Sequence, residues 1–344
     1  MQREVADEAP IFVVGTGRSG TSLLRAMLNA HPDLYLAQEA NFHAWLGLLG
    51  WEREPEWLLR EWFRSFGFAW LRVDAVALRA ELPATLTHAD VHRAYERALQ
   101  LKAEQHGARR WGEKNPLLTM NLGDLFERYP NARVVYMVRD PRTNALSQAS
   151  MPWSTSSLWA ATQMIRDQYD KARPFADRML FVRLEDLLAD PEAQMRRVLD
   201  YCGLPFDAAV LDHASGPPDD GIPFPWLLPA AEARKERPTR KAQALSPAWT
   251  RLVEERCGAL MDDLGYARAE LPAEPVFGAR FFAIFFDFPA LNLYLLRLIA
   301  VTAKVRWGLP DAAEAQRLSC STNPAAWKLH PDWTLPEPPP VQLP

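Results

Sequence analysis

A glycine-rich loop near the start of the chain carries the residue types of a phosphate- or sulfate-binding site. The segment from Gly15 to Ser22 reads GTGRSGTS and lies between an apolar run and a helical pattern. Glycines let the backbone curl until successive N–H groups face one point, and the first turn of a helix adds positive potential there. Nucleoside triphosphatases have a lysine at the position of Thr21, whereas this chain supplies a cation, Arg18, inside the loop. The alternative interpretation is an incidental glycine turn between a strand and a helix.

A second cation stands where another predicted strand ends. Arg139 follows the apolar run 133–138, and Ser147 comes eight residues later in a predicted helix. Open α/β sheets bind ligands outside the carboxyl ends of their strands, where the glycine loop is also expected. An arginine can bind a terminal phosphate through two parallel hydrogen bonds. Two anion sites at one edge suit a ligand with phosphate groups at both ends. The simpler interpretations are an ion pair between Arg139 and Asp140 or another carboxylate, and a surface hydroxyl for Ser147.

Alternating strands and helices are expected to position these groups. Short apolar runs predict strands over 11–14, 34–36, 133–138 and 179–184. The helical spacing of apolar residues predicts helices over 21–30, 55–66, 88–105, 116–129, 141–150 and 191–202. Such alternation is typical of a parallel sheet covered on both faces by helices. The sequence therefore predicts an α/β fold: a P-loop-like parallel sheet flanked by helices, a mostly helical insert over 41–110 and a C-terminal helical extension.

The overall composition excludes several classes of protein. Of the 344 residues, 48% are hydrophobic and 24% are charged, so neither wholesale disorder nor a fibrous protein fits. The formal net charge of -4 provides no strongly basic face for duplex nucleic acid. Cys202, Cys257 and Cys320 have neither the number of a disulfide framework nor the spacing of a zinc site. Residues 1–10 lack the apolar run of a secretory signal, so we expect a reducing, cytoplasmic location.

Three segments of the sequence resemble motifs of the sulfotransferase superfamily that uses 3′-phosphoadenosine 5′-phosphosulfate (PAPS), and they follow one another in the order found in that family. They are GRSGTSLL at 17–24, VVYMVRDPR at 134–142 followed by Ser147, and VRLEDL at 182–187 followed by GLP at 203–205. The resemblance extends over about residues 10–266. It implies that PAPS is the sulfuryl donor, that 3′-phosphoadenosine 5′-phosphate (PAP) is the product and that no metal is needed.

The resemblance also implies which residues bind the donor. The 5′-phosphosulfate is expected to bind the glycine loop, at Arg18, Ser19, Gly20, Thr21 and Ser22. Arg139 and Ser147 are expected to bind the 3′-phosphate. A further basic loop of some members has no clear copy here, and Arg240 is the candidate for that contact from the segment 234–241. Leu184 stands where many relatives have a tyrosine near the adenine, so we expect the adenine contacts elsewhere.

Transfer of a sulfuryl group to a hydroxyl requires a base for the acceptor's proton and a cation beside the leaving phosphate. The resemblance implies Glu39 as the base, because the tyrosylprotein and heparan branch has a glutamate at this place. It implies Lys114 as the cation, because WGEKNP at 111–116 resembles the family's Glu-Lys-Thr-Pro block. His43 is the rival base. The simpler interpretations are a solvated loop carboxylate for Glu39 and an exposed lysine for Lys114.

Aromatic residues gather outside the predicted donor site. Five tryptophans lie between Trp45 and Trp70, and five phenylalanines lie between Phe281 and Phe288. The first group predicts mainly core packing, with an apolar or sugar-stacking acceptor pocket as the functional alternative. We therefore expect the acceptor to be a hydroxyl group of an apolar or glycosylated molecule. The segment 277–303 fits a lid, a homodimer interface, a peripheral membrane segment or a packed helix, and its charges and proline disfavour a spanning helix.

The chain is expected to divide into a sulfotransferase domain over 1–268, an aromatic extension over 269–330 packed on it and a Pro-rich tail over 331–344. Residues 335–344 of this tail are expected to be disordered. Residues 215–240 predict a long loop. Two other functions stay open. One is a nucleotide kinase or another phosphotransferase, which the threonine at position 21 disfavours. The other is a non-catalytic nucleotide-binding module.

Overall fold

Five parallel strands form the central sheet, in the order β2-β3-β1-β4-β5. The computed structural model describes residues 9–212, 221–226, 245–271, 278–308, 311–329 and 331–344. The strands are β1 (Ile11–Gly15), β2 (Leu34–Gln38), β3 (Arg110–Lys114), β4 (Arg133–Val138) and β5 (Met179–Arg183). The chain runs outward from β1 to β2, returns to β3 and then crosses to β4 on the other side of β1. The direction of the chain along the sheet thus reverses at β1, and sheets of this kind bind ligands outside the carboxyl ends of the strands at such a point.

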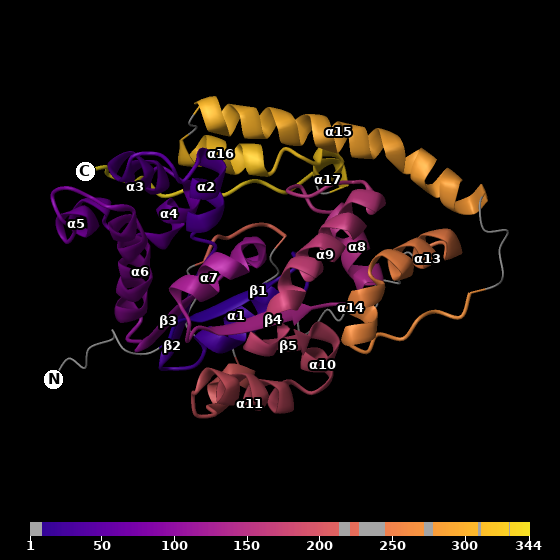
Figure 1. Cartoon of the computed structure of the whole chain (residues 1–344), viewed down its shortest axis with the longest axis horizontal. Coiled ribbons are helices and arrows are strands. Elements are labelled where there is room, and N and C mark those ends of the chain that lie inside the picture. Colours follow the sequence, from indigo (N-terminus) through magenta and orange to yellow (C-terminus); the bar gives the residue numbers. More distant parts are fainter. Residues whose placement is uncertain (1–8, 213–220, 227–244, 272–277, 309–310, 330) are drawn as a thin grey trace.

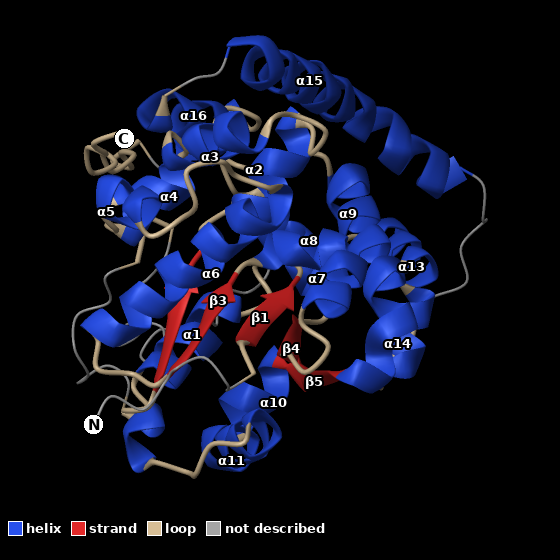
Figure 2. Cartoon of the chain, turned by 60° about the vertical axis from the view of Figure 1, so that its left-hand side comes forward, coloured by secondary structure: helices blue, strands red, loops and turns tan. Residues whose placement is uncertain are grey.

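Helices cover both faces of the sheet (Figure 2). Successive residues of a strand point to opposite sides, so a strand of consecutive apolar residues makes both faces of the sheet apolar. Ile11 and Val13 of β1 belong to the apolar cluster on one face, and Phe12 and Val14 to the cluster on the other. The first cluster is completed by α1 (Thr21–Asn29), α10 (Leu184–Ala189), α11 (Pro191–Cys202) and η4 (Ala208–Leu211). The second contains η2 (Pro116–Asn121), α7 (Leu122–Arg128), α8 (Pro141–Ala149), α9 (Leu158–Ala172), η3 (Arg173–Arg178), α13 (Pro247–Arg256) and α14 (Gly258–Asp263). The predicted α/β fold is thus confirmed.

The insert between β2 and β3 is helical, as predicted. It consists of α2 (Phe42–Leu49), α3 (Pro55–Phe63), α4 (Phe66–Leu71), α5 (Ala75–Ala80) and α6 (His88–Gln105). Phe42, Trp62, Phe63 and Phe68 are fully buried in its apolar cluster, and their rings contact one another. Core packing is therefore the main role of these aromatic side chains.

The C-terminal extension contains α15 (Gly278–Gly308), α16 (Ala312–Ser319) and α17 (Pro324–Leu329). The long helix α15 runs across one side of the molecule and contacts α2, α9 and α13 (Figure 1). The final residues, predicted to be disordered, instead pack on the protein. Leu335 lies against the cluster that contains Trp70, and the Pro336 carbonyl accepts a 2.9 Å hydrogen bond from Gln316 Nε2. These contacts hold the Pro-rich segment in place although it forms neither helix nor strand.

The structure divides one predicted helix into two elements and describes part of one predicted loop. The helix predicted over 116–129 is two elements, η2 and α7, because Asn121 leaves the helical conformation at φ −126° and ψ 26°. Of the loop predicted over 215–240, the structure describes 221–226, which form neither helix nor strand. The division into a domain over 1–268 and an extension over 269–330 stays a prediction.

Candidate active site

The glycine loop joins β1 to α1 in a conformation that requires glycine. Gly15 has a φ of 130°, and a Cβ atom there would lie 2.2 Å from the Met137 carbonyl oxygen on β4. The amide of Gly15 donates to Thr119 Oγ1 at 3.1 Å, which ties the start of the loop to η2. Arg18 and Gly20 also have positive φ angles, of 65° and 95°, and these angles continue the turn of the loop backbone. Left-handed conformations of this kind turn successive amides toward one point.

The start of α1 has the features of an anion site. Gly20 occupies the N-cap position, and no described side chain caps the helix. Thr21 and Ser22 are its first two residues, so their amides lie among the N–H groups that lack a partner within the helix. Ser19 differs from the expectation, because both its amide and its hydroxyl donate to the Thr16 carbonyl, at 3.1 and 2.6 Å. Ser19 therefore shapes the loop in this structure.

The tertiary structure brings Arg18, Arg139 and Ser147 together, although they lie far apart in the sequence. Arg18 Nε donates to Ser147 Oγ at 3.2 Å, and Arg139 Nη1 donates to the Arg18 carbonyl at 3.3 Å. Burial, and secondarily the charge of Arg139, lowers the pKa of Arg18 to about 10. Burial also lowers the pKa of Arg139. Two guanidinium groups held this close, and partly out of water, favour an anionic ligand between them.

The ion pair considered between Arg139 and Asp140 is made by another arginine. Asp140 caps α8 through the Arg142 amide and binds the Arg142 guanidinium at 2.6 Å. Glu185 accepts hydrogen bonds from the Asp140 amide and from the Tyr266 hydroxyl, both at 2.9 Å. These contacts hold the segment after β4 that carries Arg139.

Glu39 and Lys114 meet at the carboxyl ends of β2 and β3. The register pairs Lys114 with Gln38 on one side and with Val13 on the other, which places the lysine beside the end of β1. Lys114 Nζ forms an ion pair with Glu39 Oε1. The lysine side chain is 1% exposed, whereas the glutamate side chain is 26% exposed and reaches solvent. Both predicted transfer residues thus lie at the edge that holds the glycine loop.

Glu113 fixes the backbone that carries Glu39. Its carboxylate is fully buried and accepts hydrogen bonds from Tyr95 Oη, from Asn115 Nδ2 at 2.9 Å and from the amides of Ala40 and Asn41. Burial raises the pKa of Glu113, and these hydrogen bonds oppose the rise. No role for Glu113 was predicted from the sequence. The sequence feature that could have indicated a role for Glu113 is an acidic residue inside a buried strand, next to Lys114.

We expect Glu113→Ala to lower the free energy of unfolding by about 3 kcal/mol, because the change leaves four buried donors without their acceptor. Urea denaturation measures this loss. Glu192→Ala on α11 is the matched control, since Glu192 forms a surface ion pair and is 55% exposed. That change is expected to stay within about 0.5 kcal/mol of the unchanged protein. Equal stabilities for the two variants would contradict the anchoring role of Glu113.

The rival base, His43, lies in a cluster of rings. The side chain of His43 is buried near Phe42, Trp51, His92 and Tyr95. Burial, and secondarily the charges of His92 and Arg128, lowers its pKa to about 3. An imidazole with that pKa is a weak proton acceptor at neutral pH. The geometry and the pKa therefore favour Glu39 over His43.

Several neighbours of the glycine loop were not anticipated. A Cβ atom on Gly17 would lie 2.6 Å from the Trp153 indole, so this ring packs directly on the loop. The Leu184 side chain packs in the same way on Gly20. Arg18 Nη1 donates to the Trp226 carbonyl at 3.3 Å. No local pattern signals these contacts, because each partner comes from a distant segment.

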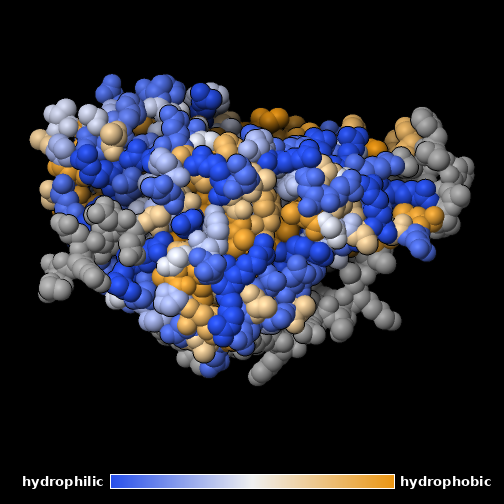
Figure 3. All heavy atoms as spheres, turned by 60° about the horizontal axis from the view of Figure 1, so that its bottom comes forward, coloured by the Kyte–Doolittle hydropathy of each residue, from blue (hydrophilic) through white to orange (hydrophobic). Residues whose placement is uncertain are grey.

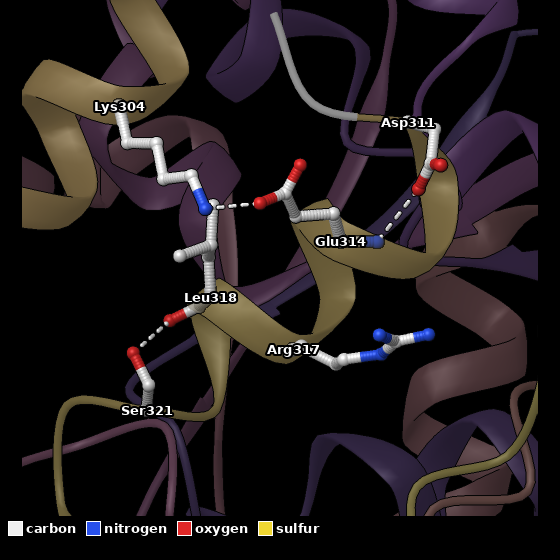
Figure 4. Close-up of a pocket in the computed structure, with 6 residues that line it drawn as sticks. All are labelled: Lys304, Asp311, Glu314, Arg317, Leu318 and Ser321. Atoms are coloured by element: carbon white, nitrogen blue, oxygen red, sulfur yellow. Dashed lines mark hydrogen bonds and ion pairs between the residues drawn. The ribbon is translucent and has the colours of Figure 1, made fainter. Parts of the chain in front are cut away.

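Three other observations complete the description of the site. Arg240 lies outside the described residues. Within the described part of the chain, no three His, Cys, Asp or Glu side chains are grouped so that they could hold a metal ion. A hollow of about 450 Å³ lies between α15 and α16, and none of its lining residues belongs to the predicted site (Figure 4).

Comparison with known proteins identifies the family. A family model described as "Sulfotransferase family" matches residues 10–208, more than half of the chain. The chain belongs to the sulfotransferase family. The resemblance inferred from the three sequence blocks is thereby confirmed.

The curated relatives are protein-tyrosine sulfotransferases. The chain is 32% identical to the "Protein-tyrosine sulfotransferase" of Drosophila melanogaster, over 59% of this chain and 40% of that protein. It is 29% identical to "Protein-tyrosine sulfotransferase A" of Caenorhabditis elegans, over 59% of this chain and 52% of that protein. The chain thus spans about half the length of the curated relatives it matches. Among solved structures, the "Sulfotransferase Domain from the Curacin Biosynthetic Pathway" matches with a TM-score of 0.46 and 18% identity, over 77% of this chain and 99% of that chain.

Proposed function

We propose that this protein transfers a sulfuryl group from PAPS to a hydroxyl group of an apolar or glycosylated acceptor. The observation that carries the proposal is the meeting of two sets of groups at one sheet edge. One set is the anion site of the glycine loop, Arg18 and Arg139, and the other is the Glu39–Lys114 pair. Membership of the sulfotransferase family supports the reaction class.

The residues present fit the two charged ends of PAPS. The amides at the start of α1 and Arg18 would hold the 5′-phosphosulfate, while Arg139 and Ser147 would hold the 3′-phosphate. Burial lowers the pKa values of both arginines, and the charge of Arg139 adds to the lowering for Arg18, so an anion bound beside them would stabilise their charged forms. Arg240 is kept as the candidate for a further 3′-phosphate contact. PAPS supplies the sulfuryl group, and PAP is the product that leaves.

Glu39 and Lys114 would have different roles in the transfer of the sulfuryl group. The Glu39 carboxylate would accept the proton of the acceptor hydroxyl, and its partial exposure lets an acceptor reach it. Lys114 would stabilise charge on the leaving phosphate, and its burial strengthens that interaction. Because the two side chains pair with each other, each holds the other at the point where donor and acceptor would meet.

Thermal shift with PAP and with ATP–Mg²⁺ separates this function from its alternatives. A ligand present at about 100 times its dissociation constant stabilises a protein by about 2.7 kcal/mol. We expect PAP to raise the melting temperature and ATP–Mg²⁺ to leave it unchanged. Stabilisation by ATP–Mg²⁺ alone would instead favour a phosphotransferase. PAP binding without transfer of labelled sulfate to any acceptor would favour a non-catalytic module.

A panel of hydroxyl compounds tests the acceptor. It contains apolar alcohols, glycosides and a tyrosine peptide, the last because the curated relatives are named protein-tyrosine sulfotransferases. Transfer of radiolabelled sulfate from PAPS identifies the preferred class. We place the reaction in the cytoplasm, and the free, buried thiols of Cys202, Cys257 and Cys320 support a reducing compartment.

Arg139→Ala is expected to weaken PAP binding by about 10- to 100-fold, since a charge-assisted hydrogen bond to an anion contributes about 1.5–3 kcal/mol. Arg139→Lys keeps the positive charge but lacks the planar guanidinium group. Its affinity for PAP should therefore fall between those of the unchanged protein and Arg139→Ala. Isothermal titration calorimetry measures both affinities. Arg196→Ala on α11 is the control, because Arg196 pairs with Glu192 on the surface. An unchanged affinity in Arg139→Ala would remove this residue from the donor site.

A further inference from the structure

The helix α15 exposes many large apolar side chains. Among the described residues, nine such side chains of α15 are at least 40% exposed: Phe281, Phe285, Phe288, Leu293, Leu295, Leu296, Leu298, Ile299 and Trp307. Between Asp287 and Gly308 the helix is long and apolar enough to cross a membrane by length and composition, and 6% of its most apolar window is buried. Soluble proteins rarely expose so continuous an apolar surface to water.

Two polar side chains of α15, Asp287 and Tyr294, face the protein. Asp287 accepts hydrogen bonds from the Ser157 hydroxyl and from the amides of Leu158 and Trp159, the latter two at 3.1 and 3.0 Å, at the start of α9. Seven residues later, the Tyr294 hydroxyl contacts Met164 Sδ at 3.8 Å. These spacings keep one helical face on the protein.

The C-terminal half of α15 is anchored in the same way. Arg297 Nη1 donates to the Ser321 carbonyl at 2.9 Å, and the Val305 side chain is buried. Lys304 forms an ion pair with Glu314 of α16 at the rim of the hollow shown in Figure 4. Arg297 and Val305 thus hold the C-terminal half of α15 on the protein.

We define the outward face of α15 as Phe285, Phe288, Leu296, Ile299 and Trp307. Their exposed fractions are 59%, 55%, 66%, 65% and 79%. Their spacings of three, eight, three and eight residues return to one side of a helix, because two turns take about seven residues. By contrast, hydrophilic and hydrophobic residues are interspersed on the side of the molecule seen in Figure 3.

A membrane-spanning orientation does not fit these contacts. It would place Asp287 and Arg297 in hydrocarbon, where a charged side chain is costly, and would break their hydrogen bonds to the rest of the protein. A helix that lies flat keeps those bonds and buries only its outward face. Such interfacial helices combine apolar and aromatic residues with nearby cations.

The charges of α15 favour an anionic lipid surface over a neutral one. Asp287 is the single acidic residue in the sequence 278–308, and it is turned toward α9. Arg306 is exposed next to Trp307, the side chain with the highest exposure on the outward face. A tryptophan beside a cation is typical of the boundary between lipid headgroups and acyl chains.

We propose that the outward face of α15 binds the interfacial layer of an anionic membrane, with the helix parallel to the membrane plane. This proposal does not depend on the sulfotransferase reaction. One consequence concerns the transfer site, because α15 packs against α2, whose first residue follows Glu39 by three positions. Membrane binding thus brings the helix that begins next to Glu39 close to the bilayer.

Vesicle flotation with the full chain tests the proposal. One set of vesicles is phosphatidylcholine mixed with phosphatidylserine, and the other is phosphatidylcholine alone. We expect the protein to float with the mixed vesicles. The double variant Leu296→Glu/Ile299→Glu should lower the partition coefficient at least about tenfold, because each change removes a buried apolar side chain from the lipid. Arg306→Gln should lower binding to the mixed vesicles about fivefold and leave binding to phosphatidylcholine unchanged.

The controls separate lipid binding from misfolding and from self-association. Leu188→Glu replaces a leucine of α10 that is 40% exposed and lies away from α15, and this change should leave flotation unaltered. Circular dichroism verifies that the variants are folded, and Trp307→Ser is the alternative variant should the double change unfold the chain. Failure of the unchanged protein to float would overturn the proposal. A dimer that Leu296→Glu/Ile299→Glu converts to a monomer, without vesicle binding, would assign the outward face to a second copy of the chain.

Discussion

Glu39→Gln is expected to lower the rate of sulfuryl transfer by about 100- to 10,000-fold, the range for loss of a positioned general base. Glutamine has the same shape and can still contact Lys114, but it cannot accept the proton of the acceptor hydroxyl. The side chain of Glu39 is 26% exposed, so the substitution leaves no buried cavity. PAP affinity should stay within about threefold, because Glu39 belongs to the acceptor side of the site. Transfer of labelled sulfate and calorimetry with PAP measure the two quantities.

Two matched variants define what this result means. Glu192→Gln makes the same chemical change on the surface of α11 and should leave transfer unaltered. His43→Gln tests the rival base, and it should retain transfer to the extent that the variant remains folded, as judged by its melting temperature. Normal turnover by Glu39→Gln, or a loss confined to His43→Gln, would show that Glu39 is not the base.

Lys114→Met is expected to lower the transfer rate by about 100- to 1,000-fold, the magnitude found when one stabilising group is removed from a developing negative charge. Methionine preserves most of the volume of the buried side chain and removes only its charge. The effect should appear in kcat with the KM for PAPS little changed, because the charge that Lys114 offsets develops on the leaving oxygen only during transfer. Steady-state kinetics over a range of PAPS concentrations separates the two parameters.

A double variant tests whether the pair acts as a unit. If Glu39 and Lys114 position each other, Glu39→Gln/Lys114→Met should lose little more than the more damaged single variant. Lys171→Met on the exposed surface of α9 is the control for loss of a lysine charge. Fully additive losses would mean that the ion pair has no positioning role. A normal kcat in Lys114→Met would remove the lysine from the mechanism.

Local sequence patterns predicted most of the sheet and its covering helices. The apolar runs that became β1, β2, β4 and β5 are short, and all but β5 are almost fully buried, so their composition and length identify them. The prediction failed where the local pattern was ambiguous. The apolar spacing over 116–129 continues through Asn121, whereas the backbone there bends and starts a new helix. Composition suggested disorder for the final residues, but contacts with α16 and with the Trp70 cluster outweigh that tendency.

In the candidate site, too, local features could be predicted from the sequence, whereas contacts between distant segments could not. The glycine loop could be predicted because its residues are adjacent and its chemistry is local to one turn and one helix start. The strand order could not be read from these residues, although it sets Lys114 beside Val13 and Gln38. The anchoring of the Glu39 turn by Glu113 and the packing of Trp153 on Gly17 are contacts between distant segments. Residue types alone did not indicate them.

By itself, the sequence determined the family, the type of fold and the identity of the groups able to bind phosphate and sulfate. Adjacent residues specify these features, since backbone turns, helix starts and strand ends depend on short-range sterics and hydrogen bonding. Only the tertiary structure decided that Arg18 meets Arg139 and Ser147 and that Glu39 pairs with Lys114. It also decided that Asp287 and Arg297 of α15 bond to the protein while large apolar side chains of the same helix are exposed. These relations depend on which surfaces pack together. Packing is a property of the whole chain, because each segment buries its apolar face against partners from distant segments.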